Sequence, residues 1–176
     1  SGTQPSLALL YPQGAKGWTK IWNGVSTYAI PNVVSNVKAG NGTSPSSVEV
    51  TWSENAVATS YKIYRATSGT AEKILLGTVW GATRYVDTSV VSGTRYYYSI
   101  VPVNGPAEGQ SSQAVEGRAQ QIKVTVHFNG NGGSLDEYQV VYTEGLPYGS
   151  FPGVTCLGRT FRGWYTAPLG GTKVET

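Results

Sequence analysis

The 176-residue chain contains 23 Gly, 9 Pro, 20 Val, 19 Thr and 12 Tyr, but only 9 Leu and no Met. Because β-branched and aromatic residues favour strands while Leu and Met favour helices, this composition excludes a helical bundle. A composition that is 39% hydrophobic and 13% charged excludes intrinsic disorder, and 13 basic residues without a run of Lys or Arg do not predict a nucleic-acid-binding face. The single cysteine excludes an internal disulfide, and no apolar stretch reaches the length of a membrane-spanning helix.

Side chains that carry out catalysis or bind metals are scarce in this sequence. It contains one histidine, His127, one cysteine, Cys156, and two aspartates, Asp87 and Asp136. Nucleophilic catalysis needs a nucleophile with a base within reach, and a metal site needs several converging ligands. We therefore predict no catalytic residue, no metal site and no cofactor, and we expect that the chain is not an enzyme. His127 and Cys156 could form a thiol–imidazole dyad, but neither has a recognisable flanking signature, so we predict a surface histidine and a buried thiol.

The first 29 residues give the least regular pattern. Ser1-Gly2 is interpreted as a scar left by expression, and residues 1–29 as this scar followed by a lead segment or by the tail of a preceding domain. Trp18, Lys20 and Trp22 share one side of an alternating segment. The two indoles could form an exposed platform on which a sugar or a base stacks, but large aromatic side chains are usually buried, so we favour packing against a neighbouring domain.

Between residues 30 and 118 the sequence predicts a sandwich of two antiparallel sheets. Apolar and polar residues alternate in short segments, as in Val48, Val50 and Trp52 and their polar neighbours, and turn residues recur at intervals of about 8–12 residues. A series of seven such strands is typical of an immunoglobulin-like sandwich. The predicted strands are 33–38, 48–53, 61–65, 73–79, 84–86, 94–104 and 111–117.

The order of landmarks in this region resembles the fibronectin type III family over about residues 31–118. The landmarks are Ile30-Pro31, Val37, Val50, Trp52, Tyr61 to Arg65, Tyr85 to Thr88, Val90, Gly93 to Tyr98 and Val103-Asn104. The resemblance implies that Tyr96 is the tyrosine-corner residue, whose hydroxyl bonds to backbone upstream. Pro102 departs from the small residue usual in the family, and because it lacks a backbone N–H the strand should be distorted or unpaired there.

The function expected for this sandwich is that of a scaffold or spacer. Its large alternating side chains fall on the inward face and are predicted to form the core: Trp52, Tyr61, Ile63, Tyr85, Tyr96 and Tyr98. No Arg-Gly-Asp tripeptide occurs, and Asn41-Gly42-Thr43 matches an N-glycosylation acceptor that is common by chance. Trp80, next to a turn at Gly81, is a candidate for ligand binding and equally a candidate packing residue.

After a linker at 119–121, residues 122–176 predict a second, smaller β-module. Val124, Val126 and Phe128 alternate with polar residues. The Asn- and Gly-rich segment 129–133 predicts a hairpin turn rather than a phosphate-binding loop, because neither a Gly-Lys-Ser/Thr ending nor a helix follows it.

This second module resembles the internalin-type B repeat of bacterial surface proteins. The matching elements are Val126-His127-Phe128, Asn131 to Gly133, Tyr148-Gly149, Pro152, Phe161 to Tyr165 and Gly170 to Val174. The resemblance implies a β-grasp-like fold with Phe128, Phe161 and Trp164 as its core. Because the family pattern continues for a further strand, the module is expected to be incomplete and less stable than the sandwich, with an open edge through which chains could self-associate.

Two hypotheses of function follow from these observations. The first is a non-catalytic modular fragment of a secreted or cell-surface bacterial protein that acts as a spacer or display scaffold and as an interaction or adhesion unit. The alternative is a set of accessory modules, with carbohydrate binding through Trp18, Trp22 or Trp80, of an extracellular enzyme whose catalytic domain lies outside this chain. Both place the chain outside the bacterial cell or at its surface, with an unknown protein or glycan partner, no nucleic acid and no membrane insertion within this chain.

Overall fold

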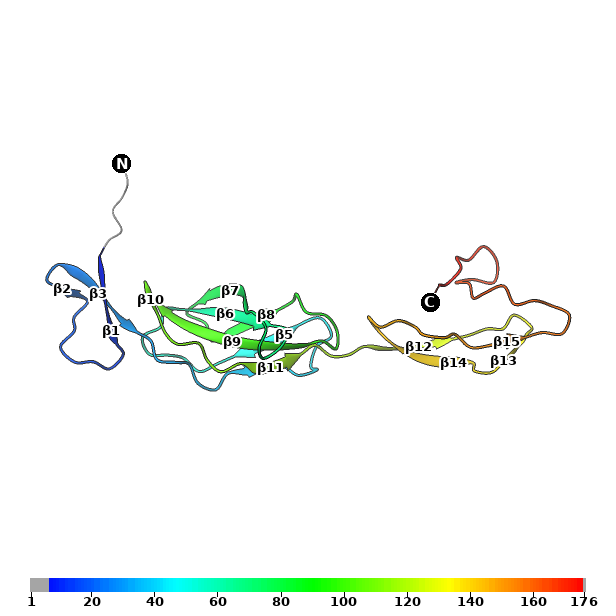
Figure 1. The fold of residues 1–176 in the computed structure, drawn as a ribbon, viewed down its shortest axis with the longest axis horizontal. Coiled ribbons are helices and arrows are strands. Elements are labelled where there is room, and N and C mark those ends of the chain that lie inside the picture. The colour runs from blue at the N-terminus through cyan, green and yellow to red at the C-terminus, as the bar shows by residue number, and fades with distance from the viewer. Residues whose placement is uncertain (1–6, 176) are drawn as a thin grey trace, which may run out of the picture. The chain divides into compact units, whose positions relative to one another are not determined.

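The computed structural model describes residues 7–175, and in this range the chain forms strands and turns without a helix (Figure 1). The all-β fold class predicted from composition is therefore confirmed. Ser1-Gly2, interpreted above as an expression scar, lies outside the described residues. The chain divides into two compact units, Ser1–Gln120 and Gln121–Thr176.

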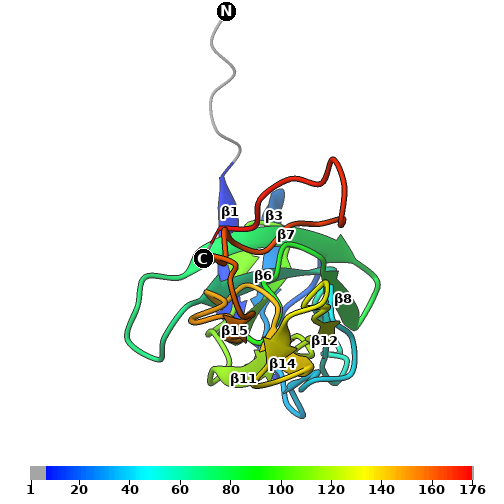
Figure 2. The same ribbon diagram turned by 90° about the vertical axis from the view of Figure 1, so that its right-hand side faces the viewer.

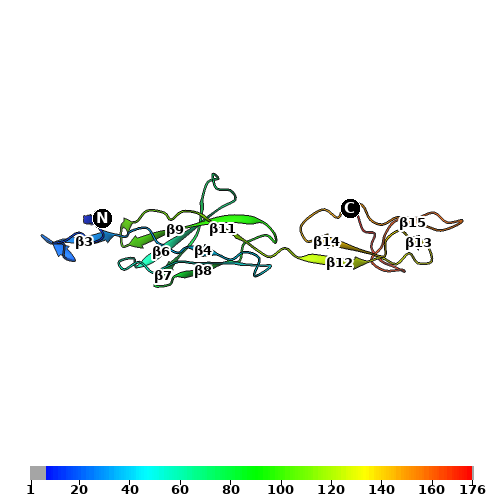
Figure 3. The ribbon, with the colours of Figure 1, turned by 90° about the horizontal axis from the view of Figure 1, so that it is seen from below.

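The first unit contains an immunoglobulin-like sandwich of two antiparallel sheets. Its strands are β4 (Lys38–Ala39), β5 (Val48–Thr51), β6 (Ser60–Ala66), β7 (Ile74–Trp80), β8 (Arg84–Asp87), β9 (Arg95–Asn104), β10 (Ala107–Glu108) and β11 (Val115–Arg118). One sheet has the order β4-β5-β8 and the other has the order β10-β9-β6-β7. Strand β11 pairs with the first half of β9 (Figure 3). This arrangement is a fibronectin type III-like sandwich.

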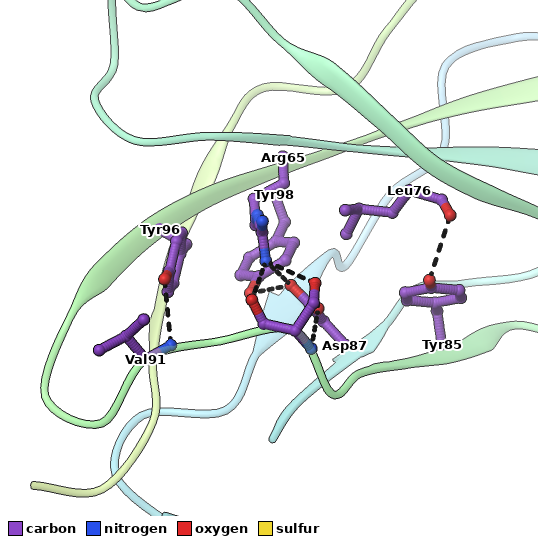
Figure 4. Close-up of polar contacts among 8 residues, drawn as sticks. Arg65, Leu76, Tyr85, Asp87, Val91, Tyr96 and Tyr98 are labelled. Carbon is purple, nitrogen blue, oxygen red and sulfur yellow. Dashed lines mark hydrogen bonds and ion pairs between the residues drawn. The ribbon is translucent and has the colours of Figure 1, made fainter. Parts of the chain in front are cut away.

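Alternate side chains of these strands fill the space between the two sheets. Five of the six side chains predicted to form the core are at most 5% exposed and belong to one cluster: Trp52, Tyr61, Ile63, Tyr96 and Tyr98. Tyr85 is half-buried at the edge of this cluster, and its hydroxyl donates a hydrogen bond to the carbonyl oxygen of Leu76 at 3.4 Å (Figure 4). The hydroxyl of Tyr96 accepts a hydrogen bond from the backbone N–H of Val91 at 3.1 Å, which is the tyrosine-corner geometry that the resemblance implies.

The first predicted strand of the sandwich is shorter in the structure than the sequence suggests. Of residues 33–38, only Lys38 enters a ladder. Asn36 adopts a left-handed backbone conformation with φ 53°, which interrupts the extended chain. Val34 and Val37 still pack against the core, although residues three positions apart lie on opposite faces of a strand. Val33, which would share a face with Val37 in a strand, is 49% exposed, so the predicted alternation is wrong in this segment.

Pro102 disturbs one side of β9 and leaves the other intact. On the side of β6, the ladder runs through Pro102, which lies opposite Tyr61. On the other side the carbonyl of Pro102 accepts a hydrogen bond from the N–H of Gly109 at 2.8 Å, so its nitrogen also faces this way. Residues 109–114 form no strand there. The missing N–H therefore explains the gap between β10 and β11, and the predicted irregularity is confined to that edge.

The lead segment forms a small sheet attached to one end of the sandwich. Its strands are β1 (Ala8–Pro12), β2 (Ile21–Trp22) and β3 (Val25–Ile30), in the order β1-β3-β2 with β1 parallel to β3 (Figure 1). The side-chain amide of Asn104 donates to the carbonyl oxygen of Ala29 at 3.0 Å, and that of Asn55 donates to the carbonyl oxygen of Asn32 at 2.9 Å. The lead sheet is thus part of the first unit.

Within residues 121–175, the second unit contains four short strands and little buried surface. They are β12 (Lys123–His127), β13 (Ser134–Leu135), β14 (Gln139–Thr143) and β15 (Val154–Thr155), and β12 pairs with β14 (Figure 2) while β13 pairs with β15. Phe128 and Trp164 are half-buried, with ring centroids 4.7 Å apart. Phe161 is 47% exposed, so the prediction that it is a core residue is wrong. The reason is that residues 156–175 form only one isolated bridge, and the contact with Trp164, at 5.4 Å between ring centroids, covers the Phe161 ring only in part.

Candidate functional site

A tight turn places Trp22 at the tip of the lead sheet. Asn23 and Gly24, with φ values of 49° and 78°, join β2 to β3. Positive φ at both central residues defines the two-residue hairpin turn for which Asn-Gly is strongly preferred. The turn sets Trp22 opposite Val25 in the ladder. The Asn-Gly dipeptide is a signal in the sequence from which this hairpin could have been predicted.

The loop between β1 and β2 folds back against β3. The backbone N–H of Thr27 donates to the carbonyl oxygen of Lys20 at 3.0 Å, and the Thr27 hydroxyl donates to the carbonyl oxygen of Thr19. Thr27 itself is buried. These bonds hold the end of the loop, and with it Trp18, beside the strands that carry Tyr11 and Trp22.

Three aromatic rings from this loop and its two flanking strands form one cluster, which we call the aromatic surface: Tyr11, Trp18 and Trp22. The rings of Tyr11 and Trp18 stack with centroids 4.9 Å apart and an interplanar angle of 1°. Trp22 lies 6.1 Å from Trp18 and is tilted by 50°. Lys20 is also exposed. The sequence predicted the two tryptophans but missed Tyr11, because the loop that brings it to Trp18 has no periodicity.

Packing explains only part of this aromatic surface. Stacking against Tyr11 covers one face of Trp18, which is the role that the sequence favoured for it. Yet Trp18 remains 38% exposed and Trp22 49% exposed. Clustered aromatic side chains that stay open to solvent mark binding surfaces more often than isolated ones do. The aromatic surface is therefore the candidate binding site of the first unit.

Trp80, the third predicted candidate, stands apart from the aromatic surface. It ends β7, is 73% exposed, and forms no ring contact with the other described residues. It lies opposite Ser60, which in turn lies opposite Val103 of β9. Because the neighbouring Asn104 anchors the lead sheet, Trp80 lies at the end of the sandwich to which that sheet is attached.

A buried charged cluster ties the two sheets of the sandwich together. Asp87 at the end of β8 is 2% exposed, and its carboxylate accepts hydrogen bonds from Arg65 at 2.7 Å and from the Tyr98 hydroxyl at 2.9 Å (Figure 4). The backbone N–H and hydroxyl of Ser89 donate to its other oxygen at 2.9 and 2.7 Å. The Arg65 guanidinium also lies 4.6 Å from the ring centre of Tyr96. With every acceptor occupied and the carboxylate sealed from solvent, this cluster stabilises the fold.

The pKa values of this cluster follow from its contacts. Burial alone would raise the pKa of the Asp87 carboxyl, but the hydrogen bonds from Ser89, Arg65 and Tyr98 outweigh it and lower that pKa. Burial and the bond to the Asp87 carboxylate both raise the pKa of the Tyr98 hydroxyl, which therefore stays protonated.

Acidification is expected to weaken the sandwich through Asp87. Because its pKa is lower in the folded than in the unfolded chain, the stabilisation is present above the unfolded value of about 4 and disappears as the pH falls through the folded value. Urea unfolding measured from about pH 6 down to pH 2 should show this loss. An Asp87→Asn variant, which cannot titrate there, should have a shallower pH dependence, and equal slopes for the two proteins would contradict the assignment.

The second unit has an open, aromatic-lined cleft of about 960 Å³. Ring contacts connect Phe128, Tyr142, Tyr148, Phe151 and Trp164 along it. Of these, Tyr142 is buried, and its hydroxyl has no hydrogen-bond partner among the described residues. The cleft is the incompletely covered hydrophobic core of this unit.

The described residues do not assemble a metal site. No group of three or more His, Cys, Asp or Glu side chains within residues 7–175 could hold a metal ion. Cys156 is exposed, with its Sγ 3.9 Å from the carbonyl oxygen of Gly132, so the prediction of a buried thiol is wrong. His127 is exposed on β12, as predicted. Over the same range no helix is long and apolar enough to cross a membrane.

The fold defines the class of protein: an all-β chain with a fibronectin type III-like sandwich. An Fn3-like protein from Clostridium thermocellum is 26% identical with a TM-score of 0.48, and the match covers 53% of this chain and 98% of that one. The FN5 domain of Drosophila Lar is 19% identical with a TM-score of 0.44, and the match covers 52% and 98%. No family model matches the chain.

The curated relatives are bacterial enzymes much longer than this chain. An amylopullulanase of Thermoanaerobacter thermohydrosulfuricus is 30% identical over 122 residues, which are 67% of this chain and 8% of that enzyme. An amylopullulanase of Thermoanaerobacterium saccharolyticum is 36% identical over 92 residues, which are 50% of this chain and 7% of that enzyme. The chain therefore spans less than a tenth of the length of these relatives.

Proposed function

We propose that this chain is a non-catalytic accessory region of an extracellular bacterial enzyme that acts on glucans of the amylose or pullulan type. The observation that carries the proposal is its match to amylopullulanases from two bacterial genera, in which the matching part is 8% of the enzyme or less. Most of each relative therefore lies outside the part that this chain resembles. A sequence with one His, one Cys and two Asp suits a supporting role beside a separate catalytic domain.

A second candidate is the spacer or display role in a surface protein. It is supported by the resemblance of residues 122–176 to the internalin-type B repeat. That resemblance rests on the order of the glycines and aromatic residues in this segment. Exposed apolar side chains such as Val124 and Val141 on β12 and β14 would suit pairing between copies of the chain. The match to amylopullulanases favours the accessory role over this one.

An antiserum against the purified chain tests the accessory role directly. Proteins secreted by the source organism are separated on two identical gels, one blotted with the antiserum and one containing pullulan and developed for hydrolysis. The expected result is one secreted band that reacts with the antiserum, coincides with a zone of hydrolysis and is far larger than 18.7 kDa. The purified 176-residue chain, run alongside, serves as the control and should clear no substrate.

A secreted band that reacts with the antiserum but never coincides with hydrolysis of pullulan or starch would overturn the accessory role. In that case the display role would be the better description of the chain.

A further inference from the structure

We propose that the aromatic surface of Tyr11, Trp18 and Trp22 binds a neutral glucan chain of the amylose or pullulan type. The choice of glucan rests on the proposed function, whereas the location of the site rests on the geometry of the lead sheet. The proposal assigns to residues 7–30 the task of holding the polymeric substrate, and to the sandwich the task of carrying that surface.

The apolar faces of sugar rings stack on exposed aromatic rings, and two indoles here are available for such contacts. Trp18 and Trp22 are neighbours at 6.1 Å and retain 38% and 49% of their surface in contact with solvent. Stacking of Trp18 on Tyr11 at 4.9 Å fixes the orientation of its indole before any ligand arrives. A ring that is already ordered loses less conformational entropy on binding, so the site is preorganised.

The angle between the indoles indicates the shape of the ligand. Trp18 and Trp22 are tilted by 50° relative to each other, so they present two different planes rather than one flat strip. Successive sugar rings of a flat, ribbon-like β-linked chain would stack on coplanar aromatic rings. A curved α-linked chain turns its successive rings, and the tilted pair of indoles matches such a chain.

Polar groups beside the indoles can bond to sugar hydroxyls. Lys20 lies between the two tryptophans in the sequence and Asn23 follows Trp22 in the hairpin turn, and both are exposed. A few polar groups around an apolar contact surface are the usual composition of a small-ligand site, in which they give orientation and specificity. The side chain of Lys20 also gives this surface a positive charge, which makes an anionic polymer the main competing ligand.

The test is affinity electrophoresis of the full 176-residue chain in gels that contain soluble pullulan or amylose. We expect the polysaccharide to retard the migration of the chain. Because the ligand carries no charge, the affinity of the chain for the polysaccharide in solution should be unchanged in about 0.5 M salt, which shortens the Debye length to a few ångströms. Trp22→Ala should weaken binding by roughly tenfold or more, the effect of losing one stacking ring. Trp22→Tyr, which keeps an aromatic face, should restore most of it.

Trp80→Ala is the matched control, because it removes another exposed indole of the same unit that stands apart from the aromatic surface. It should bind pullulan as the unaltered chain does. Since Trp22 is half-exposed, its replacement should leave the thermal unfolding of the sandwich unchanged, which separates loss of binding from loss of folding.

Several results would overturn the proposal. They are the absence of retardation by either glucan, equal retardation of the Trp22→Ala variant, binding that disappears at high salt, or stronger binding of a soluble β-linked glucan. If the secreted band coincides with hydrolysis but the chain does not bind glucan, the accessory role is supported and the glucan-binding role of the aromatic surface is overturned. If the chain binds glucan through Trp22 but the secreted band does not coincide with hydrolysis, the accessory role is overturned and the glucan-binding site is supported.

Discussion

Replacing Asp87 with Ala is expected to destabilise the sandwich by about 3–5 kcal/mol, the usual cost of removing one member of a buried ion pair. The carboxylate is 2% exposed and accepts hydrogen bonds from Arg65 and Tyr98. Without it, the Arg65 guanidinium, whose side chain is 13% exposed, keeps its charge with its main partner gone. The hydroxyl of Tyr98, a fully buried residue, also loses its acceptor.

The measurement for this prediction is urea unfolding of the full chain followed by tryptophan fluorescence, since Trp52 belongs to the sandwich core. Glu116→Ala is the matched control because it also removes a carboxylate from an ion pair of the first unit. Its partner Arg95 lies 3.6 Å away, and the side chains are 40% and 64% exposed. Exposed pairs contribute little, so this variant should unfold like the original chain. A loss for Asp87→Ala no larger than that of the control would contradict the role assigned to the buried cluster.

Replacing Gly117 with Val is expected to destabilise the sandwich by about 1–3 kcal/mol through overpacking. A Cβ at this position would lie 2.7 Å from the Cβ of Ala39, 2.9 Å from a methyl of Val48 and 3.0 Å from the ring of Tyr98. These atoms belong to three different strands, β4, β5 and β9, and Val48 and Tyr98 are fully buried. None of them is the free end of a flexible side chain, so strands must move apart to admit the new group.

Gly69→Ala provides the control for this prediction. A Cβ at Gly69 would meet nothing within 4 Å, and its backbone is not left-handed. The substitution should therefore be neutral, or slightly stabilising because Ala restricts the unfolded chain. Thermal unfolding of both variants gives the comparison. Equal midpoints for Gly117→Val and Gly69→Ala would show that the space around Gly117 is not filled as the structure has it.

The aromatic surface illustrates why function is harder to predict here than fold. The alternation of Trp18, Lys20 and Trp22 marked the segment, yet the general tendency of tryptophan to be buried favoured packing as its role. The structure shows that packing covers only part of these rings. Tyr11 could not have been added from the sequence, because its contact with Trp18 depends on how the intervening loop folds back on β3.

Local patterns determined the architecture of the sandwich. Apolar residues at every second position in Val48–Trp52 and Tyr96–Ile100 face inward in any strand, so the sequence alone could predict that the members of these runs are buried. The turn-forming glycines and prolines separated the strands in the same local way. The all-β class and the core of the sandwich follow from such short-range rules, whereas the tyrosine corner at Tyr96 is implied by the resemblance to the fibronectin type III family.

Tertiary structure decided what depends on residues far apart in the chain. Asn36 takes a left-handed conformation that interrupts the first predicted strand, so that Val34 and Val37, which would lie on opposite faces of a strand, both pack against the core. Phe161 has the pattern of a core residue, but it is 47% exposed because its ring contact with Trp164 covers it only in part. The sequence shows which side chains can be buried, and only the packing of distant segments determines which of them are. For this reason the core of the sandwich could be predicted from the sequence, whereas the partial exposure of the aromatic rings in the lead sheet and the second unit could not.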